Sequence, residues 1–388
     1  MIALKKNADR RIRAGHLWVF SNEIAQPTVS QLEQGSVHEI YEAAGEFLGM
    51  GYANPASLIT ARILSRKKVQ IDGKFLRERI KSALELRNRL FPNRDHYRLV
   101  YGESDGLPGL IVDRYGPYLA VQSLTAGMDR LLDDVVEVLV EIMSPEGIFV
   151  RNDSPARSLE GVPLEKGLAY GLLPELVSIR SGDLTFQVDI QNGQKTGFFL
   201  DQESNRGLMS RYVYPGARVL DLFCYTGAWG IHALNAGAAE VTGVDSSRGA
   251  LLLAQSNAAL NNVSDRFIPV RDSAIEFLKK SRDTWDLIVL DPPAFIKSRS
   301  HVSEGRKGYI DANRRALGKL NPGGILVTCS CSYHLDASAF EEVLILAARQ
   351  SGKSLRILEV RGQGPDHPVL LSMPETRYLK VIAAQTVP

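Results

Sequence analysis

The stretch that most constrains this chain of 388 residues is RVLDLFCYTGAWGI, residues 218–231. Its apolar residues surround Asp221 in a short run typical of a buried strand. A glycine turn follows, and residues 228–235 are predicted to form a helix. Strand, glycine turn and helix make the first half of a nucleotide-binding βαβ unit, which predicts an α/β sheet.

The glycine turn also indicates the class of ligand. A dinucleotide site requires G-x-G-x-x-G so that the backbone can approach a pyrophosphate, but this turn has only Gly227 and Gly230. The carboxylate of Asp221 would repel a phosphate and attract an ammonium group, and S-adenosylmethionine carries an ammonium beside its sulfonium. We therefore predict a site for S-adenosylmethionine that includes Asp221 and the turn residues Phe223, Thr226 and Gly227.

Three further apolar runs are predicted strands that each end at an acidic residue. They are residues 241–244 before Asp245, 267–270 before Asp272, and 285–290 before Asp291. Ligands of open α/β sheets bind at the carboxyl ends of the strands, so Asp245 is expected to accept the ribose hydroxyls and Asp272 the adenine amino group. One such aspartate is usually a helix cap or a turn residue, but four at one edge indicate a binding site.

The rest of the C-terminal half completes a seven-stranded sheet whose last pair is antiparallel. The predicted elements are a helix at 299–320, a tight turn at 321–324, a strand at 325–328, a helix at 337–349, and strands at 355–360 and 377–382. This order resembles the class I methyltransferase arrangement, a Rossmann-like α/β fold.

The N-terminal region is predicted to be a small β-barrel, because short alternating runs are separated by Gly, Asn and Pro turns. These runs are residues 17–20, 36–41, 47–52 and 58–64. Residues 1–98 hold 17 Lys and Arg against 10 Asp and Glu, and the remainder holds 29 against 34. A basic end is a candidate surface for a polyanion, although a solvated surface would show the same balance.

The run from Gly35 through GEFLGMGYANPASLITARILS, which ends at residue 65, resembles a PUA domain, an RNA-binding module. The resemblance implies sequence-independent contacts to the RNA backbone from five basic residues. These are Lys5, Lys6, Arg10, Arg11 and Arg13.

The middle of the chain is predicted to be an α+β domain. Its elements are a helix at 72–91, two or three strands within 97–124, a helix at 128–143 and a strand at 148–151. Glu103, Asp105 and Asp113 lie in a glycine-flanked segment that is more typical of turns than of a catalytic cluster. We predict three domains, at 1–70, 71–185 and 186–388.

A strand at 186–190 and a helix that follows residue 195 lead into the third domain. The segment resembles the corresponding part of a bacterial family of PUA-containing methyltransferases, which implies that it lies over the cofactor and that Gln202 and Arg206 contact the cofactor. In the alternative interpretation Asp201 caps the helix and Arg206 pairs with a nearby carboxylate.

Two segments are expected to meet beside the cofactor, DPPAF at 291–295 and CSCS at 329–332. A D-P-P-aromatic corner is common in enzymes that methylate planar heterocycles, where Asp291 would hold the base edge and Phe295 would stack on its face. Cytosine carbon 5 becomes nucleophilic only after a thiolate adds to carbon 6, which requires a cysteine at this edge. Cys331 is the predicted nucleophile, because Cys329 lies deeper on the same face.

Five further motifs, together with the N-terminal segment, extend over most of the chain. They are QKTGFFLDQESNR, DLFCYTGAWG, DPPAF, SCS and GPDHPV. Together they resemble the bacterial PUA-containing family of S-adenosylmethionine-dependent 23S ribosomal RNA cytosine-5 methyltransferases. The position of Cys331 is the nucleophile in that family. Many RNA cytosine-5 methyltransferases carry a second cysteine where Ala294 and Phe295 stand here, so the base for the final elimination is left open among Asp291, water and His334.

Two other functions compete with this interpretation. A guanine or adenine N-methyltransferase could use the same scaffold, and a relative of that class has asparagine where Cys331 lies. Alternatively, an inactive fold could serve RNA folding or ribosome assembly.

Composition narrows the remaining possibilities. Three cysteines are too few for a disulfide framework. The pair Cys329-x-Cys331 has no second pair of ligands for zinc, so no metal site is expected. No apolar run suits a membrane span or a signal peptide, so we expect a cytoplasmic protein that acts on RNA and on neither DNA nor membranes. No stretch indicates a dimer interface. Cys224 and the three histidines at 301, 334 and 367 are expected to be structural.

Overall fold

A computed structural model describes residues 1–387, which fold as two compact units. The first unit contains Met1–Ile179, Val188–Leu200 and Pro365–Thr376, and the second contains Arg180–Gln187, Asp201–Gly364 and the residues from Arg377. Short segments from late in the chain therefore belong to the first unit. The predicted three-domain division stays a prediction.

The first unit begins with a six-stranded sheet in the order β2-β6-β5-β4-β1-β3. Its strands are β1 (Ile2–Leu4), β2 (Trp18–Val19), β3 (Ile24–Gln26), β4 (Val37–Tyr41), β5 (Phe47–Ala53) and β6 (Ala61–Ser65), with helix α1 (Arg10–Arg13) between the first two. The predicted β structure is confirmed, but β1 and β3 were missed because three residues carry too little alternation. The predicted strand at 58–64 begins later, at Ala61, since Leu58 lies in an exposed turn.

A second sheet in the same unit has the order β11-β10-β9-β8-β7. Its strands are β7 (His96–Tyr101), β8 (Leu110–Tyr115), β9 (Tyr118–Ser123), β10 (Gly147–Asn152) and β11 (Glu165–Gly171), and its helices are α2 (Gly73–Leu90), α3 (Ala126–Arg130) and α4 (Leu132–Met143). Asp72 caps α2 by accepting from Phe75 N at 3.0 Å. The predicted single helix at 128–143 is wrong in one respect, because it breaks at Leu131 into α3 and α4.

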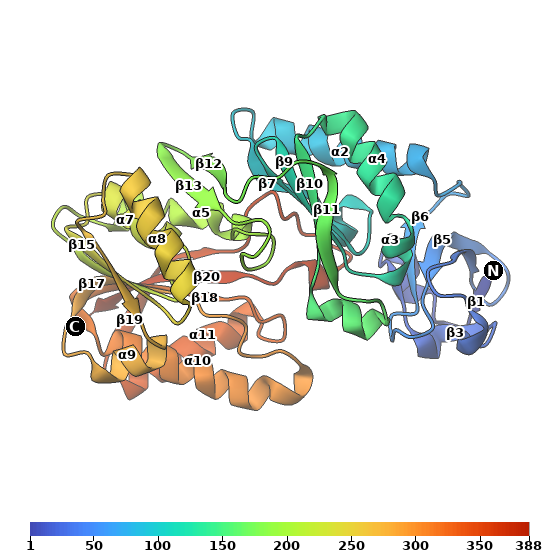
Figure 1. Ribbon diagram of the computed structural model, residues 1–388. Coiled ribbons are helices and arrows are strands. Elements are labelled where there is room, and N and C mark those ends of the chain that lie inside the picture. The colour runs from blue at the N-terminus through green and yellow to red at the C-terminus, as the bar shows by residue number, and fades with distance from the viewer. Residues whose placement is uncertain (388) are drawn as a thin grey trace. The chain divides into compact units, whose positions relative to one another are not determined.

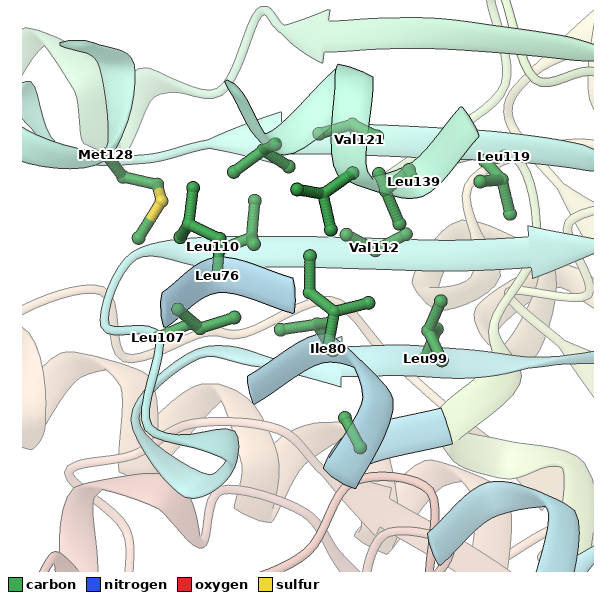
Figure 2. Close-up of a cluster of buried hydrophobic side chains, with 14 of the residues drawn as sticks. Leu76, Ile80, Leu99, Leu107, Leu110, Val112, Leu119, Val121, Met128 and Leu139 are labelled. Carbon is green, nitrogen blue, oxygen red and sulfur yellow. The ribbon is translucent and has the colours of Figure 1, made fainter. Parts of the chain in front are cut away.

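One hydrophobic core of this unit lies between the helices and the second sheet. Figure 2 shows Leu76 and Ile80 of α2 beside Leu110 and Val112 of β8, with Leu139 of α4 in the same cluster. All five side chains are fully buried. This packing joins helices and strands into one hydrophobic core.

The second unit contains a seven-stranded sheet in the order β16-β15-β14-β17-β18-β20-β19. Its strands are β14 (Arg218–Leu222), β15 (Glu240–Asp245), β16 (Phe267–Arg271), β17 (Trp285–Leu290), β18 (Leu320–Ser330), β19 (Ser354–Arg361) and β20 (Lys380–Val387). β14 to β18 are parallel, and β20 is antiparallel to both of its neighbours. The predicted Rossmann-like methyltransferase sheet is confirmed.

Helices cover both faces of this sheet, as Figure 1 shows with α7 and α8 on one side and α9, α10 and α11 on the other. The helices are α5 (Glu203–Arg206), α6 (Met209–Tyr212), α7 (Ala228–Asn235), α8 (Arg248–Leu260), α9 (Ala274–Lys280), α10 (Val302–Leu317) and α11 (Ala337–Gln350). The central strands β14 and β17 are mostly apolar because both of their faces are covered.

Several predicted boundaries in the second unit are wrong. β18 begins at Leu320, so the predicted tight turn at 321–324 is part of the strand. Trp285 pairs with Leu320 and Leu287 pairs with Ile325, so the residues between form a bulge, in which Gly323 has a φ of 75°. Two hairpin strands, β12 (Val177–Ser181) and β13 (Leu184–Val188), precede this sheet. The strand predicted at 186–190 is β13, which begins and ends two residues earlier. The strand predicted at 377–382 is β20, which begins at Lys380 and ends at Val387.

Among residues 1–387, no helix is both long enough and apolar enough to cross a membrane.

Candidate active site

The turn after β14 is held in an uncommon backbone conformation. Phe223, Tyr225 and Gly227 have φ values of 61°, 49° and 80°. Left-handed conformations are costly for residues other than glycine and are concentrated at functional sites. Gly230 must also lack a side chain, because a Cβ there would lie 2.8 Å from a methyl carbon of Val241. The missing side chain therefore lets the start of α7 pack closely against β15.

Asp221 lies beneath this turn and is fully buried. Its Oδ2 accepts from Gly230 N, in the first turn of α7, at 2.9 Å. The pKa of Asp221 is raised to about 8, chiefly by burial and to a smaller extent by the charges of Asp291 and Asp245. The contact to Gly230 N acts in the opposite direction but does not compensate for the loss of water. The carboxyl group is thus poised to release its proton when positive charge approaches.

Asp245, at the end of β15, organises the adjacent strand end. Its Oδ2 accepts from Tyr225 N at 3.0 Å and its Oδ1 accepts from Ser247 N at 2.8 Å. Ser247 in turn caps α8 by accepting from Ala250 N. Each oxygen of the half-buried carboxylate keeps a further lone pair, which suits the predicted contact to two hydroxyl groups.

Asp272, at the end of β16, has partners of its own. Its carboxylate accepts from Lys280 Nζ at 3.0 Å and from Ser273 N at 2.8 Å. The bond from Lys280 lowers the pKa of Asp272. These contacts fix the start of α9, which is the structural role that a single aspartate after a strand most often has. Its predicted contact with adenine stays a prediction.

Gln202 and Asp291 come together although 89 residues separate them in the chain. Gln202 Nε2 donates to Asp291 Oδ2 at 3.0 Å, and Trp229 Nε1 donates to the same oxygen at 3.1 Å. Asn205 Nδ2 donates to Gln202 Oε1 at 2.7 Å, which fixes the orientation of the Gln202 amide. The two predicted site residues therefore belong to one hydrogen-bonded network.

Arg206 lies in the interior, with 2% of its surface exposed. Its guanidinium donates to Glu203 Oε2 at 2.7 Å, three residues earlier on the chain. Glu203 also accepts from Ser181 Oγ. The structure thus places Arg206 in the local ion pair that the alternative interpretation describes, and a contact with the cofactor stays a prediction.

The three cysteines differ in exposure. Cys224 and Cys329 are buried at 4% and 1% exposure, and burial raises the pKa of both thiols well above their usual value. Cys331 follows the last residue of β18 and is half-buried. Its Sγ lies 3.9 Å from Pro292 O, the carbonyl after Asp291. The fold therefore brings the CSCS and DPPAF segments together at the strand edge.

The backbone around Cys331 is clamped by its neighbours. Ser332 Oγ accepts from Ile296 N at 3.1 Å and lies 2.9 Å from the hydroxyl of Tyr309. The ring of Phe295 packs on that of Tyr309, with centroids 4.6 Å apart. Phe295 thus supports the corner, and its predicted stacking on a base stays a prediction.

Comparisons with known proteins agree with this geometry. Family models of a PUA-like domain and of an S-adenosylmethionine-dependent methyltransferase match residues 2–66 and 150–374. Over 99% of its length the chain is 38% identical to the ribosomal RNA large subunit methyltransferase I of Shewanella frigidimarina, of which 98% is covered. The protein of the same name from Aeromonas hydrophila is 38% identical, with 98% of this chain and 97% of that protein covered. The chain belongs to the S-adenosylmethionine-dependent methyltransferase family.

Solved structures show the same fold for the methyltransferase. A Streptococcus mutans protein assigned as a SAM-dependent methyltransferase has a TM-score of 0.85 at 21% identity, with 99% of both chains covered. The protein SMU.776, complexed with SAH, has a TM-score of 0.86 at 22% identity, with 99% of this chain and 100% of that chain covered. At sequence identities this low, the structural similarity establishes the fold and nothing finer.

The residues of the methyltransferase fit its cofactor, S-adenosylmethionine. Within residues 1–387, Asp221 Oδ1 and Thr226 Oγ1 are buried without a hydrogen-bond partner. Buried polar atoms are rarely left unpaired, so their presence at the strand edge fits a ligand that brings its own donors and positive charge. That Asp221, Thr226 and Asp245 hold the cofactor stays a prediction.

The basic residues of the PUA-like domain have different surroundings. Lys5 Nζ donates to Asn22 O at 2.9 Å, whereas Arg11 and Arg13 pair with carboxylates. Lys6 and Arg10 are exposed and form no ion pair within the described residues. These two are the most available to a phosphate backbone.

Sequence reasoning missed two side chains at this strand edge, Trp229, which donates to Asp291, and Lys380, which donates to Ser332 O. Trp229 lies in α7, directly after the glycine turn, where an indole is expected only to pack in the hydrophobic core. Lys380 lies in the apolar run YLKVIAA, and a single charge inside a buried strand is a signal that could have been used.

Proposed function

We propose that this methyltransferase forms 5-methylcytosine in large-subunit ribosomal RNA, with Cys331 as the covalent nucleophile. The near full-length similarity to proteins named ribosomal RNA large subunit methyltransferase I supports the choice of RNA. The observation that carries the chemistry is the position of Cys331. It is the least buried of the three cysteines and lies against Pro292 O, at the same strand edge as the cofactor residues.

In this proposal the target cytosine is flipped out of its stack into the corner between β17 and β18. Asp291, oriented by Gln202 and Trp229, holds the nitrogen edge of the base. The cofactor supplies an electrophilic methyl group on a sulfonium. The thiolate of Cys331 adds to carbon 6, and this addition makes carbon 5 nucleophilic.

The adduct must then be resolved. After carbon 5 is methylated, a base removes the proton from carbon 5, the double bond to carbon 6 reforms, and the thiolate of Cys331 leaves. Asp291 and His334 remain candidates for the base, together with water. His334 is half-buried beside Tyr333, with ring centroids 5.2 Å apart, in the loop that follows Cys331.

We further propose that the PUA-like domain supplies sequence-independent affinity for the RNA backbone through its basic residues. Such contacts position the RNA without reading its bases. A ribosomal substrate would place the enzyme in the cytoplasm.

The proposed chemistry is tested with ribosomal RNA and labelled S-adenosylmethionine, followed by nucleoside analysis. Wild type should produce 5-methylcytosine, and Cys331→Ala should produce none. Cys329→Ala is the matched control, because it removes a thiol two residues away that is buried, and it should still form the product. RNA containing 5-fluorocytosine should trap a denaturation-resistant complex with wild type and not with Cys331→Ala, because fluorine at carbon 5 blocks the elimination.

Label on a guanine or adenine nitrogen, unaffected by Cys331→Ala, would overturn the proposed chemistry in favour of N-methylation. Absence of cofactor binding by calorimetry would instead favour an RNA-binding scaffold without activity.

A further inference from the structure

Lys380 is a buried lysine at the edge where Cys331 lies, and the mechanism above does not use it. Only 8% of its surface is exposed. Its Nζ donates to Ser332 O at 2.6 Å and to Tyr378 O at 2.8 Å. The first of these carbonyls belongs to the residue directly after Cys331. Burying an ammonium costs free energy unless it is hydrogen-bonded or paired, so a charge at this position is expected to have a function.

The sheet topology explains how Lys380 reaches the site. β20 inserts between β18 and β19 and runs antiparallel to β18. Lys380, the first residue of β20, pairs with Ser330, the last residue of β18. Cys331 is one residue further along the chain. The ammonium at the start of β20 therefore lies at the end of β18, next to Cys331.

The charges around Lys380 favour its protonated form. The pKa of Lys380 is lowered to about 8, chiefly by burial, and the charges of Cys331 and Asp336 act in the opposite direction. Asp336 is exposed and caps α11 by accepting from Ala339 N at 2.8 Å. Cys331 also acts electrostatically on the buried hydroxyl of Tyr309, whose pKa is raised chiefly by burial. Cys331 is thus the group near Lys380 that the proposed reaction needs in its charged form.

We propose that Lys380 is a positioning residue whose ammonium stabilises the Cys331 thiolate before the RNA base is attacked. Two of its three N–H groups donate to the Ser332 and Tyr378 carbonyls, which leaves one for the sulfur. The thiol proton passes to solvent, and the ammonium keeps its own protons. The inference rests on the proposed function, because it explains how the assumed nucleophile is ionised near neutral pH.

The test measures the ionisation of Cys331 directly, without RNA. The rate of alkylation by iodoacetamide is followed from pH 6 to 10 in the full chain, and Cys331 is identified by mass spectrometry of its peptide. Lys380→Met should move the midpoint of this profile upward by about one pH unit, which slows alkylation at pH 7 about tenfold. Lys380→Arg keeps the charge and should remain near the wild-type profile.

Lys353→Met is the matched control. Lys353 Nζ also donates to a backbone carbonyl, that of Leu320 at 2.7 Å, and burial lowers its pKa as well. It lies at the opposite end of β18, so its removal should leave the Cys331 profile unchanged.

An unchanged midpoint in Lys380→Met, with cofactor binding intact by calorimetry, would show that Lys380 only ties the two strand ends together. If Lys380→Met does not fold, Lys380→Gln keeps a donor for the carbonyls and removes the charge, and the same midpoint decides. Failure of this inference differs from failure of the proposed function. In the first case wild type still forms 5-methylcytosine with an unshifted variant profile, and in the second wild type forms none.

Discussion

Gln202 donates to Asp291 Oδ2 at 3.0 Å, and this one bond joins the segment before α5 to the end of β17. Trp229 donates to the same oxygen, and Asn205 fixes the Gln202 amide from behind. Gln202 and Asn205 are buried, so the bonds are shielded from water and hold the carboxylate in one orientation. The relationship suggests that Gln202 acts through Asp291.

Gln202→Ala should therefore lower the rate of methylation more than it weakens RNA binding. Loss of a hydrogen bond to a charged group costs about 1.5–3 kcal/mol, which corresponds to roughly a 10- to 100-fold lower kcat. Steady-state kinetics with ribosomal RNA separate kcat from KM. Gln385→Ala removes an amide at the other end of the same sheet, where it donates to Gly323 O, and should have wild-type kinetics. Equal kcat in the two variants would contradict this role.

Asp221→Asn should change how stability depends on pH. The pKa of Asp221 is about 8 in the folded chain against 3.8 when unperturbed, so between these values the folded state binds a proton that the unfolded state releases. Wild type should lose stability as pH rises from about 4 to 8, and the asparagine variant should not. From pH 5 to pH 8 the variant should gain on the order of 3–4 kcal/mol relative to wild type.

Denaturant unfolding of the cofactor-free protein at several pH values measures this difference. Asp265→Asn, at an exposed carboxylate, is the control and should follow wild type in parallel. Parallel curves for Asp221→Asn as well would show that the buried carboxyl does not titrate in this range.

Arg87→Met should destabilise the first unit strongly. Arg87 is fully buried and donates to both oxygens of Asp105, at 2.6 and 2.8 Å. Removing one partner of a buried pair leaves an uncompensated charge and costs about 3–5 kcal/mol. Arg77→Met on the same helix breaks an exposed pair with Glu141 and should have a small effect. Equal losses in the two variants, measured by denaturant unfolding, would contradict the difference in burial.

The double variant Lys6→Ala with Arg10→Ala should weaken RNA binding and reduce its dependence on salt. Each phosphate that is no longer neutralised lowers the slope of log K against log salt by about 0.7–0.9, so the two substitutions together should lower it by about 1.5. Filter binding at salt concentrations between about 50 and 200 mM measures the change. Lys279→Ala, in an exposed pair with Glu276, should leave the slope unchanged. An unchanged slope in the double variant would place the phosphate-binding residues elsewhere.

Most of the methyltransferase unit could be predicted because its signals are local. The helix at Ala228–Asn235 and the strand at Trp285–Leu290 match their predictions residue for residue. The helix follows a glycine turn, and the strand is a mostly apolar run, as expected of a buried parallel strand. The predictions failed where the pattern is short or interrupted. β1 has three residues, and the start of β18 contains a bulge that has the composition of a turn.

The order of residues along the chain was sufficient to place four aspartates at one sheet edge, because parallel strands joined by helices bring their carboxyl ends together. Only the tertiary structure decided what each group can do there. Asp272 is held by Lys280, Cys329 is buried while Cys331 is not, and Lys380 reaches Ser332 from a position 48 residues later in the chain. Burial and pairing depend on contacts between distant segments, and no local pattern records them.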